Sequence, residues 1–143
     1  MSAFIHLPVQ QDCLIIIPYT QKDVDDWAVM FKRCYEMAGM TNMDRIQITP
    51  GYGLWTAGIG FQAGAERLGS MVIPMGPGNT DKQLQMMMDM KTTVLGSTSS
   101  YALLLAEEIQ KRGIKDKIHL KKVSLVPNAG VKRCGNVLQR NLV

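Results

Sequence analysis

A regular alternation of short apolar runs with amphipathic stretches constrains the fold of this chain more than any other feature. The apolar runs resemble buried strands and occupy 13–17, 44–50, 70–75, 92–97 and 117–126. The stretches between them have apolar residues at helical spacing and predict helices over 20–39, 59–68, 80–90 and 99–113. The sequence therefore predicts an α/β fold, in which alternating strand-helix units form a largely parallel sheet with flanking helices.

Capping signals support two of these helices. Thr20 is followed three residues later by Asp23, which resembles a capping box, and Gly39 is a natural C-terminal stop. Thr80 with Gln83 predicts a second capping box, at the start of the helix that runs through 90.

Length and composition indicate one globular domain. The chain has 143 residues, of which 46% are hydrophobic and 20% are charged. No apolar run approaches the roughly 18 residues that span a bilayer, and the first residues lack the basic start and apolar core of a signal peptide. We therefore expect a cytoplasmic protein with no membrane contact. Cys13, Cys34 and Cys134 follow no metal-binding spacing and are interpreted as small buried residues.

The charge distribution argues against a nucleic-acid partner. The formal net charge is +4, but Lys132, Arg133 and Arg140 lie in a C-terminal stretch without acidic residues. The remainder of the chain is therefore close to neutral. A nearly neutral body gives little support for binding to a phosphate backbone.

The segment "GIGFQA", Gly58 to Ala63, matches the GxGxxG/A pattern of dinucleotide-binding folds, with Asp81 downstream as a candidate ribose ligand. That pattern must follow its strand directly, whereas "PGYGLWTA" separates Gly58 from the preceding strand. Close packing of a helix on a neighbouring backbone is the other reason for Gly58, Gly60 and Gly64 on one helix. A Rossmann-like dinucleotide-binding module is an alternative, as is a non-catalytic partner-binding α/β domain.

The segment "GYGLWT" places two aromatic residues, Tyr52 and Trp55, between the end of a strand and a helix. Open α/β sheets bind ligands at this position. The same aromatics could instead cap the edge of the core, and the sequence does not separate these two interpretations. We find no Ser/His/Asp arrangement, no paired carboxylates and no phosphate loop in the sequence.

Five motifs, YTxxD, YGL(F/W)T, GAExLG, VIPxxxGNTxxQ and SYAL, follow one another between Ile16 and Lys122. In these motifs the chain resembles the phenylacetate-CoA ligases, AMP-forming members of the acyl-adenylate superfamily. The resemblance implies that 15–122 form part of the ligase N-terminal α/β subdomain. It also implies an enzyme that joins an arylacetate to ATP as an acyl-adenylate, releases pyrophosphate, and lets the CoA thiol displace AMP.

The resemblance assigns part of the acyl-group site. Tyr52, Gly53 and Trp55 match the aromatic loop of the family, with Trp55 where Phe is usual and Pro50 where some members have another tyrosine. These departures leave the identity of the aryl acid open. No catalytic, cofactor-binding or metal residue carries over, because the acidic motif and the catalytic lysine of the family are expected beyond Val143. ATP, Mg and CoA would serve the intact enzyme, and we expect this chain alone to be inactive.

The two ends, 1–14 and 123–143, depart from the family pattern. Family members have a phosphate loop such as SGTTGLP before the first strand, since glycines let backbone N–H groups approach phosphates. Here that place holds "PVQQDCL", Pro8 to Leu14. Codons for SGTTGLP read one base late encode this stretch, and codons for a family-like continuation, GIIGSERWGEKMRKRI, read one base late encode Val123 to Leu138. We hypothesise that both ends are out-of-frame readings of a ligase gene. Divergence of two surface segments is the competing explanation.

A partial ligase subdomain has a further expected property. Strands that are central in an intact enzyme would lose neighbours and expose sheet edges and apolar faces. We therefore expect self-association through exposed sheet edges.

Overall fold

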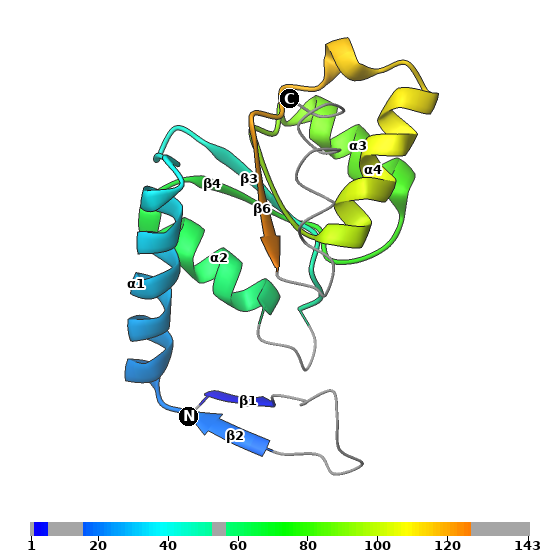
Figure 1. The fold of residues 1–143 in the computed structure, drawn as a ribbon. Coiled ribbons are helices and arrows are strands. Elements are labelled where there is room, and N and C mark those ends of the chain that lie inside the picture. The colour runs from blue at the N-terminus through cyan, green and yellow to red at the C-terminus, as the bar shows by residue number, and fades with distance from the viewer. Residues whose placement is uncertain (1, 6–15, 53–56, 127–143) are drawn as a thin grey trace.

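The computed structural model describes residues 2–5, 16–52 and 57–126 of the chain (Figure 1). The elements follow in the order β1 Ser2–Ile5, β2 Ile16–Tyr19, α1 Gln21–Met37, β3 Arg45–Ile48, α2 Ala57–Leu68, β4 Met71–Pro74, α3 Thr80–Asp89, β5 Val94–Thr98, α4 Ser99–Lys111, a 3-10 turn at Lys115–Lys117 and β6 Lys122–Val126. Within the described ranges, no helix is both long enough and apolar enough to cross a membrane.

Four of the strands form a parallel sheet in the order β4-β3-β5-β6. In its centre, Ile46 of β3 is paired with Val72 of β4 on one side and with Val94 of β5 on the other. Ile46 and Val94 are fully buried, as expected for strands that are covered on both faces. The predicted α/β fold with a largely parallel sheet is confirmed.

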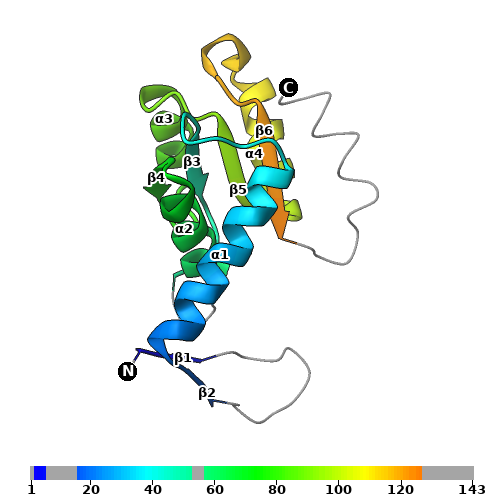
Figure 2. The same cartoon turned by 90° about the vertical axis from the view of Figure 1, so that its left-hand side faces the viewer.

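The helices cover the sheet in two pairs, and each pair builds its own apolar core (Figure 2). Helices α1 and α2 pack on one face, where Tyr35 and Phe61 join Ile46 and Ile48. Helices α3 and α4 pack on the other face, where the buried residues are Leu84, Met87, Leu95, Ala102, Leu105, Ala106, Ile109 and Leu120. The sheet therefore forms the middle layer of three.

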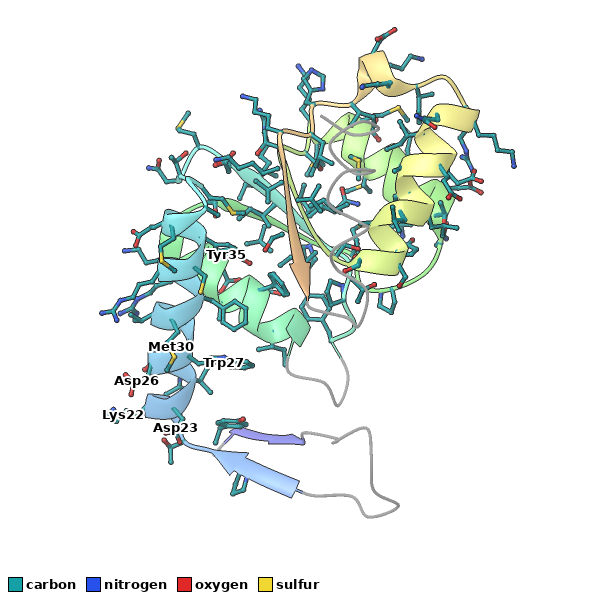
Figure 3. All side chains as sticks on the ribbon, viewed as in Figure 1. Lys22, Asp23, Asp26, Trp27, Met30 and Tyr35 are labelled. Carbon is teal, nitrogen blue, oxygen red and sulfur yellow. The ribbon has the colours of Figure 1, made fainter. Side chains whose placement is uncertain are left out.

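Helix α1 begins with the predicted capping box. The Asp23 N–H donates to the Thr20 hydroxyl at 3.2 Å, and the Thr20 N–H donates to the Asp23 carboxylate at 2.8 Å. Trp27 points from α1 toward the side of α2, whereas Lys22 and Asp26 point away (Figure 3). Cys34 is exposed on this helix, so the interpretation of the cysteines as buried residues is wrong for Cys34.

The second predicted capping box is wrong. The residue that caps α3 is Asn79, whose side chain accepts from the Lys82 N–H at 3.1 Å, and Thr80 is already the first helical residue. Asn79 has a positive φ of 49°, a conformation that asparagine tolerates better than most residues. Gln83 is buried, and its side chain donates to carbonyls of the preceding connection instead of accepting from the backbone N–H of a capping residue.

The first predicted strand lies outside the parallel sheet. Its described part, β2, pairs antiparallel with β1 in a separate two-stranded sheet, with Ile17 opposite Phe4. Residues 13–15 of the prediction lie outside the described residues. The Tyr19 ring stacks on Trp27 with centroids 6.1 Å apart, which ties β2 to α1. Pro18 has no N–H to donate, so it suits an edge strand better than a central one.

The last predicted strand begins later than expected. Residues 115–117 form a 3-10 turn, and β6 starts at Lys122. The N–H groups of Lys121 and Lys122 both donate to the Thr93 carbonyl, at 2.8 and 3.1 Å, and these bonds align β6 with β5. The family pattern ends at 122, so only the first residue of β6 lies within it and the rest of the strand lies beyond it.

Candidate ligand site at the carboxyl edge of the sheet

Three connections meet the carboxyl edge of the parallel sheet. The first, 49–52, follows β3; the second, 75–79, follows β4; and the third is the start of α4 after β5. Because β3 lies between β4 and β5, the connection after β3 is flanked by the other two. Ligands of open α/β sheets bind at such edges.

Tyr52 occupies the connection after β3 and is partly buried. Its ring packs against the core on the face of α1 and α2, yet its hydroxyl is buried and has no hydrogen-bond partner among the described residues. Burial, together with a smaller effect of the negative charge of Glu66, raises the pKa of Tyr52 to about 12. Of the three predicted site residues, Gly53 and Trp55 lie outside the described residues.

The connection after β4 lies against the connection after β3. A Cβ atom built on Gly76 would lie 3.9 Å from the Tyr52 ring, and one built on Gly51 would lie 3.8 Å from Pro77. The Met75 and Gly76 N–H groups both donate to the Ile48 carbonyl at 3.1 Å. The segment 75–79 therefore forms one side of the environment of Tyr52.

Hydroxyl groups from β3 and β5 line the same edge. Thr49 donates to the Ser97 hydroxyl at 2.9 Å, and both side chains are buried. The hydroxyl of Ser99, at the start of α4, is buried and has no partner in the described part of the chain. This edge therefore presents unused polar groups on an otherwise packed sheet.

A buried amide network behind this edge was missed by the sequence analysis. The Gln83 side-chain amide donates to the Gly76 carbonyl at 2.7 Å, and its oxygen accepts from the Gln47 amide at 2.6 Å. The Thr92 hydroxyl donates to the Gln47 side-chain oxygen at 3.0 Å. The available signal was Gln47 itself, a polar residue in the middle of an apolar strand.

The glycines of α2 serve helix packing. A Cβ atom on Gly58 would lie 2.6 Å from the Gly51 carbonyl oxygen, and one on Gly64 would lie 2.3 Å from the Cβ of Phe31. Gly58 therefore faces a carbonyl oxygen, which repels a phosphate, so the geometry does not favour the dinucleotide interpretation. Among residues 2–5, 16–52 and 57–126, no group of three or more His, Cys, Asp or Glu side chains could hold a metal ion.

Alkaline pH is expected to destabilise the protein through its buried phenols. Burial raises the pKa of Tyr52 to about 12 and also raises the pKa of Tyr35. A raised pKa contributes stability that is complete below the unfolded value, about 10 for tyrosine, and is lost as pH rises through the folded value. Urea unfolding at several pH values should show the free energy of unfolding falling from about pH 10 to about pH 12. Tyr52→Phe should make this fall shallower, whereas an identical fall in both proteins would contradict the burial of Tyr52.

Comparison with solved structures shows the class of fold. The open conformation of 2-hydroxyisobutyryl-CoA ligase, in complex with 2-HIB-AMP and CoA, matches with a TM-score of 0.85 and 22% identity, covering 99% of this chain and 34% of that chain. MatB from Rhodopseudomonas palustris, in its apo form, matches with a TM-score of 0.69 and 13% identity, covering 98% of this chain and 26% of that chain. The chain therefore has the fold of part of these two proteins. No protein-family model matches the chain.

Sequence relatives narrow the comparison to one kind of CoA ligase. The phenylacetate-coenzyme A ligase of Pseudomonas putida is 43% identical over 99 residues, which are 69% of this chain and 23% of that protein. The phenylacetate-coenzyme A ligase of Escherichia coli (strain K12) is 43% identical over 97 residues, or 68% of this chain and 22% of that protein. About two thirds of the chain is thus homologous to the phenylacetate-CoA ligases, and the chain spans less than a quarter of the length of these relatives.

Proposed function

We propose that this chain forms part of the aryl-acid site of a phenylacetate-CoA ligase. The intact enzyme would convert ATP, an arylacetate and CoA to the arylacetyl-CoA, AMP and pyrophosphate, with Mg as the metal, in phenylacetate catabolism. The observation that carries the proposal is the hydroxyl of Tyr52, which is buried and has no hydrogen-bond partner among the described residues, on a ring that lies beside Gly76 of the segment 75–79. The homology of the chain to phenylacetate-CoA ligases supports it.

Tyr52 has the chemistry that an arylacetate requires. Its ring can pack against the aromatic ring of the acid, and its hydroxyl can donate to a carboxylate oxygen. A buried hydroxyl without a partner costs about 1–3 kcal/mol. A ligand that supplies the missing partner would recover part of this free energy. In this proposal Gly53 and Trp55, which follow Tyr52 in the chain, complete the aromatic loop.

Phenylacetate binding, measured by isothermal titration calorimetry on the full chain, tests this function. We expect saturable binding that Tyr52→Phe weakens about tenfold, because the variant lacks the donor. Tyr19→Phe on β2 is the matched control and should bind as the unchanged protein does. An absence of phenylacetate binding would overturn the aryl-acid site. Saturable binding of NAD instead would favour the dinucleotide-binding alternative, and a stable fold that binds neither would favour the partner-binding alternative.

The reading frame that encodes the segments 1–14 and 123–143 is a separate question. The hypothesis of out-of-frame ends must accommodate β6, which continues to Val126. It can do so because Val123, Leu125 and Val126 are apolar and suit a strand, whether they arose by out-of-frame reading or by divergence. Sequencing of the coding DNA across codons 5–17 and 121–143 would show a glycine-rich loop and a ligase continuation in the displaced frame. An intact frame without them would establish divergence.

We also retain two proposals about the state of the protein. Strands β4 and β6 are the outer strands of the four-stranded sheet, and Met71 on β4 is exposed, which supports self-association at these edges. Light scattering after size-exclusion chromatography would show assemblies larger than a monomer. The cytoplasmic location predicted from the sequence stays a prediction.

A further inference from the structure

We propose that Gln83 is a positioning residue, which holds the segment 75–79 against Tyr52 and so fixes one side of the aryl-acid site. The role of the site in aryl-acid binding rests on the proposed function. The positioning itself is measurable without any ligand.

The first step of the argument is the placement of the Gln83 side chain. Gln83 lies on α3, and only 1% of it is exposed. Its amide donates to the Gly76 carbonyl at 2.7 Å and more weakly to the Gly78 carbonyl at 3.4 Å. One side chain therefore engages two carbonyls of the same connection.

The second step is the need for this contact. The segment contains three residues with positive φ, Gly76 at 71°, Gly78 at 84° and Asn79 at 49°. Such a backbone has no ladder of helix or strand bonds, so side chains must satisfy its carbonyls. Tyr101 of α4 assists at the outer side, where its hydroxyl donates to the Gly78 carbonyl at 3.3 Å. The buried carbonyl of Gly76 depends on Gln83.

The third step is the anchor of Gln83 itself. Gln47 in the central strand β3 donates to the Gln83 side-chain oxygen at 2.6 Å and to its backbone carbonyl at 3.1 Å. Thr92 donates to the Gln47 side-chain oxygen at 3.0 Å, at the end of the network farthest from Gly76, and neither bond from Gln47 to Gln83 involves it. The side-chain amides of Gln83 and Gln47 therefore connect the segment 75–79 to the central strand β3.

The last step is the link to the site. Gly76 lies beside the Tyr52 ring, with 3.9 Å between the position of a Gly76 Cβ and the ring. A segment released from Gln83 would move away from that ring and admit water to it. Gln83 thus acts on the site through Gly76, without touching a ligand bound there.

Hydrogen exchange measured by mass spectrometry on the full chain tests this inference. The measured quantity is the exchange rate of the amides in 75–79 relative to that of the β5 amides in 94–98. Gln83→Met introduces an apolar side chain of similar length and removes the donor. We expect it to raise this ratio about tenfold, because opening the segment no longer breaks a buried hydrogen bond.

Thr92→Val is the matched control. It also breaks the buried network and should destabilise the protein to a similar extent, but it leaves the bond from Gln83 to Gly76 in place. A ratio that stays unchanged in Thr92→Val and rises in Gln83→Met supports positioning. An equal rise in both variants, or in neither, would overturn it, because Gln83 would then contribute to general stability alone.

A spectroscopic readout at the site adds a second criterion. In Gln83→Met, ultraviolet titration should show the pKa of Tyr52 falling from about 12 toward the ordinary value of tyrosine, because its burial decreases. Thr92→Val should keep the raised value. If the unchanged protein does not bind phenylacetate, the proposed function is wrong, but the exchange ratio and the pKa of Tyr52 in the two variants still test the positioning by Gln83. A failure of the proposed function is therefore distinguishable from a failure of this inference.

Discussion

Gly64→Ala is expected to destabilise the protein by about 2 kcal/mol, although alanine favours a helix over glycine by about 1 kcal/mol. A Cβ atom at Gly64 would lie 2.3 Å from the Cβ of Phe31 and 3.1 Å from its backbone carbon. Because neither atom is the end of a flexible side chain, α1 and α2 must move apart to accommodate the methyl group. Equilibrium unfolding in urea, followed by circular dichroism, measures the loss.

Gly60→Ala on the same helix provides the matched comparison. Its Cβ would meet the Phe31 ring at 2.8 Å and Trp27 at 3.1 Å, and both contacts are with outer ring atoms. The double variant with Phe31→Leu should therefore recover much of the loss from Gly60→Ala, whereas the same substitution should not rescue Gly64→Ala. A more stable Gly64→Ala protein would show that α1 and α2 are not packed at this distance.

The close approach of these helices also matters for the candidate site. Gly58, in the first turn of α2, faces the Gly51 carbonyl, and a Cβ atom built on Gly58 would lie 2.6 Å from that oxygen. Gly51 directly precedes Tyr52. A displacement of α2 by a larger residue at 64 would therefore reach the connection that carries Tyr52, so we expect the site to be sensitive to the packing of α1 on α2.

The order of the elements could be predicted from the sequence because its signals are local. Alternation of apolar runs with helical spacing identified four helices, and the Thr20 and Asp23 pair located the start of α1. The strand order β4-β3-β5-β6 could not be obtained in this way, since it depends on contacts between segments far apart. The same limit explains β2, whose partner β1 carries no distinctive strand pattern of its own.

The candidate site shows the same division. The place of Tyr52 after a strand is a local property that the sequence predicted, and the structure locates it at the carboxyl edge, whereas its assignment to the acyl-group site came from the family resemblance. Gln83 was assigned to a cap because Thr80 and Gln83 have capping-box spacing. The cap belongs to Asn79, and the true partner of Gln83 is Gln47, which is 36 positions away. The capping-box spacing of Thr80 and Gln83 was therefore misleading, because the Gln83 side chain bonds to a residue that is distant in the sequence.

Leu105→Ala is expected to lower the free energy of unfolding by about 3 kcal/mol, because it leaves a cavity in the core between α4 and the sheet. Leu105 is fully buried, whereas the adjacent Leu104 is 44% exposed. Leu104→Ala should change the stability by no more than about 0.5 kcal/mol. The two variants remove the same atoms from the same helix, so urea unfolding of both isolates the effect of burial.

The same pair of variants tests whether the face of α4 that carries Leu104 is exposed in solution. Ala102, Leu105 and Ile109 form the buried stripe, which directs the opposite face, with Leu104, toward solvent. If Leu104→Ala were as destabilising as Leu105→Ala, that face would be covered in solution, and self-association through α4 would replace the sheet edges as the expected contact. If only Leu105→Ala is destabilising, the apolar packing of α4 comes from its sheet-facing stripe. In that case the contact of Tyr101 with Gly78 depends on the same stripe, and Leu105→Ala should loosen the segment 75–79 as well.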